Sequence, residues 1–201
     1  MKKILLTFVA LFCIISSTYA QHYEKSIEIY GGPGLDKFSK YSFGIEMING
    51  VRFNNYFSLG IGVGFRSTKA LYYNTYESHY VYGVLISKTY ESFDTKYLIP
   101  VHARIKANLS SAKVSPFLMF DAGYTFDVGK NKNKNTEGLF YEPAFGIDIN
   151  MNNGNSLYLV VGYNVQNAHY NHYSITDLTP SYSEEIKGNA STIDLKIGFV
   201  F

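Results

Sequence analysis

Apolar residues recur at every second position through most of the chain, and this pattern constrains the fold more than any other feature. Alternate residues lie on one face of a β-strand, so a period of two is typical of strands with two unlike faces. The pattern predicts strands within residues 26–30, 41–53, 57–66, 97–108, 118–127, 141–151, 157–166 and 192–201. Segments of about nine to twelve residues suit tilted strands that cross a bilayer.

The connections between these segments alternate in length. Short turns follow the second, fourth and sixth segments, at residues 54–55, 109–115 and 152–155. Longer connections follow the others, at residues 32–40, 67–96, 128–138 and 167–188. This alternation predicts an all-β fold, an eight-stranded antiparallel up-and-down transmembrane β-barrel with both termini on the periplasmic side. Residues 81–86 read as a further strand, which would extend the third connection as a hairpin.

The first 20 residues have the layout of a secretory signal peptide: two lysines, a short apolar run and small residues ending at Ala20. We therefore expect a signal peptide at residues 1–20 and one barrel domain at residues 21–201. The single cysteine, Cys13, lies in the predicted signal, which excludes disulfides and cysteine chemistry from the mature chain. Without Lys2 and Lys3, the 18 basic residues become 16 and balance the 16 acidic ones, so binding to nucleic acid is not supported.

The period alone does not say which face lies inside, and a soluble periplasmic barrel that binds an apolar ligand would turn its apolar face inward. Glycines on the polar face, such as Gly60, Gly62 and Gly64, favour a polar lumen, where they would make room for long side chains from opposite strands. Acids and bases on this face are nearly equal in number, as expected of buried charges that must be paired. The predicted lumen charges are Glu28, Glu46, Arg52, Arg66, Arg104, Lys106, Asp121, Glu142, Asp148, Asp194 and Lys196.

The C-terminus, Lys196-Ile197-Gly198-Phe199-Val200-Phe201, resembles the β-signal of Gram-negative outer-membrane barrels. The whole mature chain resembles the small eight-stranded barrels of the OmpA/OmpX kind. With its Tyr-rich strands and its Ile99-Pro100-Val101 sequence, it is most similar to the PorT-like outer-membrane barrels of Bacteroidota. The resemblance implies residence in the outer membrane and contact with its lipid and lipopolysaccharide. It also implies assembly by the barrel-insertion machinery, which would read Gly198, Phe199 and Phe201.

One short motif suggests chemistry. His172-Tyr173-Ser174 is similar to the His-x-Ser element of barrel-type lipid A deacylases, in which His172 would be the base and Ser174 the nucleophile, oriented by Glu184 or Glu185. The match is short, Ile175 replaces the small polar residue expected next, and the triplet falls in a predicted loop. His169 and His172 have a spacing that is nonspecific for metal, and no cofactor motif is visible, so neither metal nor cofactor is predicted.

The long third connection is rich in tyrosine, a residue that offers rigid amphipathic contact area. The candidate interaction residues are Tyr72, Tyr73, Tyr76, Tyr80 and Tyr82. The sequence thus predicts a non-enzymatic scaffold whose extracellular loops bind a partner, either an extracellular or a secretion-system protein. An outer-leaflet lipid enzyme is the alternative. An eight-stranded lumen is just wide enough for side chains to fill, which argues against an open pore.

Overall fold

The computed structural model describes residues 22–82, 84–129, 137–151, 154–176 and 179–201. These residues form eight strands: β1 (His22–Pro33), β2 (Ser39–Arg52), β3 (Phe57–Val81), β4 (Val84–Asn108), β5 (Val114–Asp127), β6 (Gly138–Asn150), β7 (Ser156–Thr176) and β8 (Thr179–Val200). The predicted signal peptide and the Lys-Asn repeat at residues 130–135 lie outside the described residues. No helix in the described part of the chain is long and apolar enough to cross a membrane.

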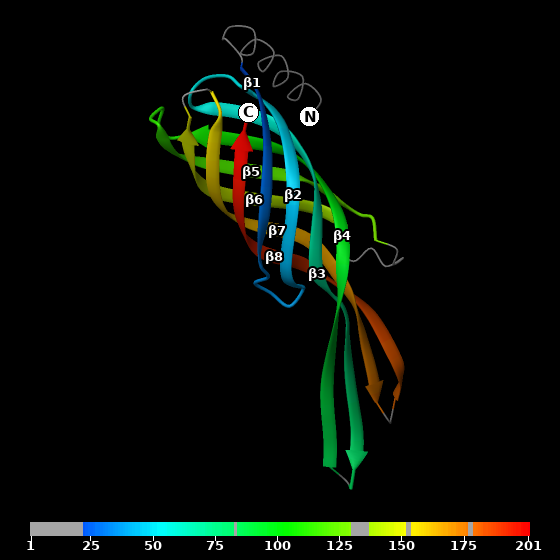
Figure 1. Ribbon diagram of the computed structural model, residues 1–201. Coiled ribbons are helices and arrows are strands. Elements are labelled where there is room, and N and C mark those ends of the chain that lie inside the picture. Colours follow the sequence, from blue (N-terminus) through cyan, green and yellow to red (C-terminus); the bar gives the residue numbers. More distant parts are fainter. Residues whose placement is uncertain (1–21, 83, 130–136, 152–153, 177–178) are drawn as a thin grey trace, which may run out of the picture.

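The strands form a closed barrel in sequence order. Each strand pairs antiparallel with the next, and β1 closes the barrel against β8 through pairs such as Ser26 with Val200. The beginning of β1 and the end of β8 lie at one end of the barrel (Figure 1). We refer to this end, which the sequence assigns to the periplasm, as the inner end and to the opposite end as the outer end. The predicted all-β, eight-stranded up-and-down barrel is confirmed.

Four strands are much longer than predicted. β3 and β4 each have 25 residues, β7 has 21 and β8 has 22, so most of the predicted loops at residues 67–96 and 167–188 are strand. The two resulting hairpins project beyond the outer end (Figure 1). There β3 pairs in parallel with β7, from Tyr73 opposite Asn171 to Ser78 opposite Thr176. The projecting parts thus form a four-stranded sheet in the order β4-β3-β7-β8, which we call the outer sheet.

The apolar positions of the barrel strands face outward. Exposed side chains include Ile29, Ile45, Ile61, Leu195 and Ile197, from four segments of the alternating pattern. Because a bilayer solvates apolar side chains, this surface suits a transmembrane barrel. On this surface Phe65 and Tyr97 stack with ring centroids 5.9 Å apart. The strands do not turn their apolar face inward, as those of a soluble ligand-binding barrel would.

Glycines of the inner face lie beside large residues of the neighbouring strand. Gly62 pairs with His102, and a Cβ at Gly62 would overlap the imidazole ring. Gly198 pairs with Tyr158 in the same relationship. The expectation that these glycines make room for side chains from opposite strands was therefore wrong in one respect. The space is taken mainly by a large side chain on the adjacent strand, because the lumen is narrow and its side chains lean over the wall.

Candidate functional site

The centre of the lumen is occupied by charged side chains. Arg104 on β4 binds Asp121 on the adjacent β5, through Nε at 2.8 Å and Nη2 at 2.7 Å. The same guanidinium reaches Glu28 on β1, through Nη1 at 2.8 Å and Nη2 at 2.7 Å. Two carboxylates thus share one guanidinium in a fork geometry that only arginine provides.

Lys196 on β8 joins this cluster from the opposite wall. Its Nζ lies 2.7 Å from Glu142, 3.4 Å from Glu28 and 3.6 Å from Asp121. All of these side chains are almost fully buried. The cluster therefore links β1, β4, β5, β6 and β8 through the lumen, in addition to the hydrogen bonds of the wall.

A second group lies toward the outer end around Arg66. Its Nε donates a 3.0 Å hydrogen bond to the Tyr30 hydroxyl, and its Nη2 lies 3.5 Å from Asp194. Asp194 also accepts hydrogen bonds of 3.0 Å from the hydroxyls of Ser42 and Thr192. A buried charge is tolerated only when it is paired and hydrogen-bonded, and Asp194 meets both conditions.

Glu46 and His102 are the least satisfied members of the charged layer. The two side chains are buried, and the Glu46 carboxylate lies 3.8 Å from Nε2 of His102. Neither group hydrogen-bonds to another residue in the described part of the chain. His102 Nε2 also lies 3.7 Å from Asp121, and its ring meets the edge of Phe140. Separations of this length suit bridging by water.

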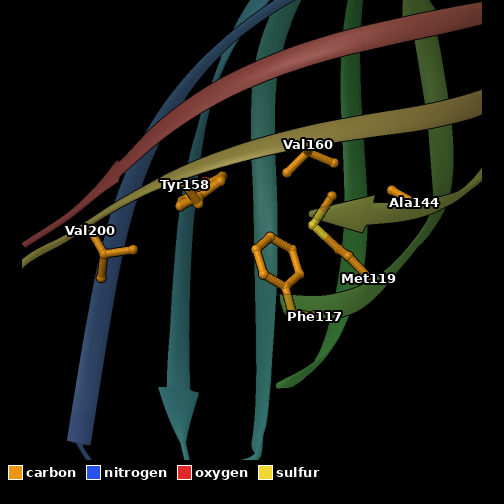
Figure 2. Packing of buried hydrophobic residues seen from close by; sticks show 6 residues of the cluster. All are labelled: Phe117, Met119, Ala144, Tyr158, Val160 and Val200. Atoms are coloured by element: carbon orange, nitrogen blue, oxygen red, sulfur yellow. The ribbon is translucent and has the colours of Figure 1, made fainter. Parts of the chain in front are cut away.

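An apolar layer closes the inner end of the lumen. It consists of Phe117, Met119, Ala144, Tyr158, Val160 and Val200, whose side chains point into the barrel (Figure 2). The Tyr158 hydroxyl connects this layer to the charges by donating a 2.8 Å hydrogen bond to Glu28. Lys106 lies over the Phe117 ring at 4.3 Å and binds Asp148 at 2.6 Å. All of them except Phe117, which precedes the predicted strand at residues 118–127, lie on the polar face of the alternating pattern, which gave no reason to expect that they pack together.

Two small cavities flank the charged layer. The inner one, of about 40 Å³, is lined by residues that include Arg104, Phe117 and Tyr158. The outer one, of about 10 Å³, is lined by residues that include Arg66 and Asn164. One water molecule needs roughly 10–15 Å³ on this scale. The two cavities therefore have room for a few water molecules, and neither has room for a larger solute.

The structure places the predicted lumen charges on the inner face of the barrel, with one at the rim. Arg52 lies at the inner end, where it pairs with Glu24 at 2.6 Å and both side chains are partly exposed. Sequence reasoning missed Lys96, which is buried although it lies in a segment predicted to be a loop. It also did not assign Tyr30 and Tyr158 to the lumen network. Their positions in the alternating pattern were the available signal, but tyrosine is equally common on a lipid-facing surface.

The predicted β-signal is divided between the two faces of β8. Lys196 points into the lumen, and Gly198 provides the space beside Tyr158. Phe199 and Phe201 are exposed on the outer surface and stack with centroids 6.3 Å apart. The same four residues therefore contribute to the lumen and to the lipid-facing surface of the finished barrel.

The β1–β2 connection ties the outer sheet to the barrel. An Asp36 carboxylate oxygen accepts a 2.6 Å hydrogen bond from the backbone N–H of Ser191 on β8. The carbonyl of Phe38 accepts a 2.8 Å bond from Leu71 N on β3, and the Phe38 ring lies against Gly188 on β8. The short loop thus bridges the bases of both hairpins at the outer end.

The candidate tyrosines occupy different parts of the outer sheet. Tyr76 lies on β3, one of the two central strands of the outer sheet, and its side chain is half-buried. Thr89 of β4 lies opposite it on one side and Ser174 of β7 on the other. Tyr82 is fully exposed at the hairpin tip with a φ of 50°, a left-handed conformation uncommon for a non-glycine residue. The backbones of Tyr72, Tyr73 and Tyr80 belong to β3, and their side chains lie outside the described part of the structure.

The His172-Tyr173-Ser174 triplet lies on β7 and not in a loop, which corrects the prediction. This segment is mostly polar, so the sequence shows no alternation of apolar residues in it. It is a strand because it pairs with β3 and β8. In the register Glu184 lies opposite His172, and Ser174 lies two residues farther along β7. The side chains of Ser174 and Glu184 are outside the described part. Among described residues, no group of three or more His, Cys, Asp or Glu side chains could hold a metal ion.

A closed eight-stranded barrel with an apolar exterior and a charge-filled lumen defines the class of small outer-membrane β-barrels. The sequence model of the outer membrane protein beta-barrel domain family matches residues 6–201. The chain therefore belongs to this family, and its location is the cell outer membrane.

Two solved structures share the fold at low sequence identity. OprG from Pseudomonas aeruginosa is 10% identical, with a TM-score of 0.58 and an alignment covering 90% of this chain and 95% of OprG. Neisserial surface protein A is 12% identical, with a TM-score of 0.52 and coverage of 90% and 97%. Comparison with curated proteins gave no match.

Proposed function

We propose that this protein is a non-enzymatic scaffold, in which the barrel anchors the outer sheet and the outer sheet binds a partner outside the cell. The single observation that carries the proposal is the parallel pairing of β3 with β7. This pairing joins two hairpins from opposite walls of the barrel into one extended surface. A surface of this kind presents contact residues in fixed positions, which lowers the entropy cost of binding.

The contents of the lumen support an anchoring role. The charged layer and the apolar layer fill the barrel from wall to wall, and the cavities beside them hold about 40 and 10 Å³. A solute would have to break several buried ion pairs in order to pass. Function is therefore better sought on the surface outside the membrane than in the lumen.

The residues of the outer sheet support a binding role. Tyr76, Tyr82 and Tyr90 have partly or fully exposed side chains and lie at three different places in the β3–β4 hairpin. Tyrosine combines a large apolar ring with a hydroxyl and is enriched at protein interfaces. The partner we propose is an extracellular or secretion-system protein. The finer resemblance to PorT-like barrels of Bacteroidota, and assembly through the barrel-insertion machinery, belong to the same proposal.

The test is photo-crosslinking on intact cells with a photoreactive amino acid at position 76 or 82, followed by identification of what is captured. The expected result is capture of a defined protein. With the reactive group at position 90 instead, we expect the otherwise wild-type protein to capture it and a Tyr76→Ala, Tyr82→Ala double variant to lose it. A matched control places the group at Ile61, which faces the bilayer. Capture of lipopolysaccharide alone at positions 76 and 82 would contradict the proposal.

A further inference from the structure

The outer sheet has an open edge along β4. β4 pairs with β5 only from Leu98 onward, whereas its pairing with β3 continues out to Val84. The last wall hydrogen bond on the β5 side runs from Val128 N to the carbonyl of Tyr97. In the described part of the chain, the backbone of residues 84–96 therefore has a partner strand on one side only.

The β5–β6 connection is too short to cover this edge. Residues 129 and 137 are its described ends. A chain spans at most about 3.5 Å per residue, so this loop reaches roughly 12 Å beyond the strands that it joins. Val128 lies opposite Tyr97, so residue 129 is level with residue 96 of β4. At about 3.3 Å per strand residue, the loop could reach about four residues of β4 beyond this level, to residue 92. The edge from residue 84 to residue 91 lies farther out.

The backbone groups that this edge presents follow from the register. In an antiparallel pair, every second residue directs both its N–H and its C=O toward the same neighbouring strand. Because the carbonyl of Tyr97 points toward β5, the odd-numbered residues of β4 point the same way. Ser87, Thr89 and Glu91 therefore present their N–H and C=O groups to the open edge, and the even-numbered residues bond to β3.

The edge lacks most of the devices that usually prevent strand addition. Proteins block free edges with proline, bulges, clustered lysines or very short strands. Residues 84–96 contain no proline, and the irregularity of the β3–β4 ladder lies near the base of the hairpin, between Leu71 and Tyr73. The exposed charges near the middle of the edge are one base, Lys88, and one acid, Glu91.

We propose that an extended segment of a partner protein adds to β4 as a fifth, antiparallel strand of the outer sheet. This inference rests on the proposed function and specifies how that partner is held. Strand addition takes its affinity from main-chain hydrogen bonds and its specificity from alternate side chains. Opposite charges across a strand pair are favourable, so the segment carries a base opposite Glu91 and an acid opposite Lys88. Antiparallel pairing puts these in the order base-x-x-acid.

A second copy of this chain does not fit the edge. Two barrels in one membrane have the same orientation, so their β4 strands run in the same direction. If a two-fold axis along the membrane normal related the two copies, the same residue of each β4 would lie at the same level. Its side chain would point to one face of the joined sheet in one copy and to the other face in the second copy. Neighbouring strands at one level must direct their side chains to the same face. A symmetric pair through this edge is thus excluded by the pleat, and the occupant that we propose is a segment of another protein.

The experiment measures binding of a synthetic ten-residue peptide of alternating Thr and Val, with Lys-x-x-Glu at its centre, to the full-length protein in lipid nanodiscs. The decisive variant is Thr89→Pro, which removes an N–H from the open edge and leaves the β3 ladder intact. Its control is Thr89→Val, which keeps the N–H. We expect the peptide to bind wild type and Thr89→Val equally, and Thr89→Pro about tenfold more weakly, as for one lost backbone hydrogen bond.

Three results would overturn the inference: no binding to wild type at millimolar peptide, equal binding to both Thr89 variants, or equal binding of a peptide with Glu-x-x-Lys. Heat-shifted gel mobility checks that each variant is a folded barrel. The assay uses no cellular partner, so its failure is separate from failure of the proposed scaffold function. If the Tyr76→Ala, Tyr82→Ala double variant loses cellular capture at position 90 but Thr89→Pro does not, the scaffold function stands and strand addition is wrong.

Discussion

The guanidinium of Arg104 on β4 donates hydrogen bonds of 2.8 and 2.7 Å to the two carboxylate oxygens of Glu28 on β1. β1 and β4 are not neighbours in the wall, since β2 and β3 lie between them. This bond therefore crosses the lumen and fixes the distance between opposite walls. It also shows why the interior is a filled layer, because the buried carboxylate of Glu28 is paired with a charge that reaches it across the lumen.

Replacing Arg104 with Leu should strongly destabilise the barrel. The change leaves Glu28 and Asp121 buried without their main partner. Removing one member of a buried ion pair typically costs about 3–5 kcal/mol. Urea unfolding in lipid vesicles, followed by circular dichroism, measures the loss.

Arg52→Leu is the matched control for this prediction. Arg52 pairs with Glu24 at 2.6 Å, but both side chains are partly exposed at the inner rim. Pairs near the surface contribute about 0–1 kcal/mol. Equal destabilisation by the two arginine variants would contradict the assignment of the charged layer as the structural centre of the barrel.

The Gly62–His102 pair predicts a coupled effect of two substitutions. A Cβ at Gly62 would overlap the imidazole, which is held among Glu46, Asp121 and Phe140 and cannot move aside freely. Gly62→Ala should therefore cost about 1–3 kcal/mol, as overpacking does. In a His102→Ala background the same change should cost little, because the ring is gone. Additive effects in a double-mutant cycle would show that the two residues do not compete for one space.

The two layers in the lumen predict that the barrel does not conduct ions. Purified protein in planar bilayers should give no current steps above the baseline of the lipid, with a general porin as the positive control. Phe117→Ala should also remain silent, because it opens the apolar layer and leaves the charged layer intact. Regular current steps in either protein would mean that the lumen opens in the membrane.

The barrel could be predicted from the sequence because a bilayer forces a strict pattern on each spanning strand. Ile193, Leu195 and Ile197 face lipid and the residues between them face the lumen, so the period reveals the strand directly. The outer sheet projects beyond the bilayer, so neither of its faces lies against lipid. Segments such as residues 87–92 are polar on both faces, and their strand structure comes from pairing between distant parts of the chain. That pairing leaves no periodic signal.

The site was predictable to a similar degree. Facing charges such as Glu28 and Lys196 followed from their positions in the pattern, but which acid pairs with which base depends on the barrel's register across the lumen. The open edge of β4 was not predictable either. It depends on the difference in length between the β3–β4 hairpin and the β5–β6 connection, and the sequence assigned much of that hairpin to a loop.

A non-enzymatic role predicts that Ser174→Ala leaves lipid A unchanged. Although the register brings His172 opposite Glu184 with Ser174 nearby on β7, these residues have no catalytic part in the proposed scaffold. Mass spectrometry of lipid A should show the same acylation in wild-type, Ser174→Ala and deletion strains. Loss of a deacylated species in both the deletion and the Ser174→Ala strains would identify an enzyme.

Two hairpins from opposite walls of the barrel form one sheet, and a disulfide between β3 and β7 tests this arrangement. Thr75 on β3 lies opposite Tyr173 on β7, and neighbouring strands bring paired Cα atoms within disulfide range. The mature chain has no cysteine of its own after the predicted cleavage, so a Thr75→Cys, Tyr173→Cys protein on oxidised cells reports this contact alone. The control couples Thr75→Cys with Asn167→Cys, about 20 Å away along β7 at 3.3 Å per residue. We expect a disulfide in the first protein and none in the control. Free thiols in both, or a disulfide in both, would contradict it.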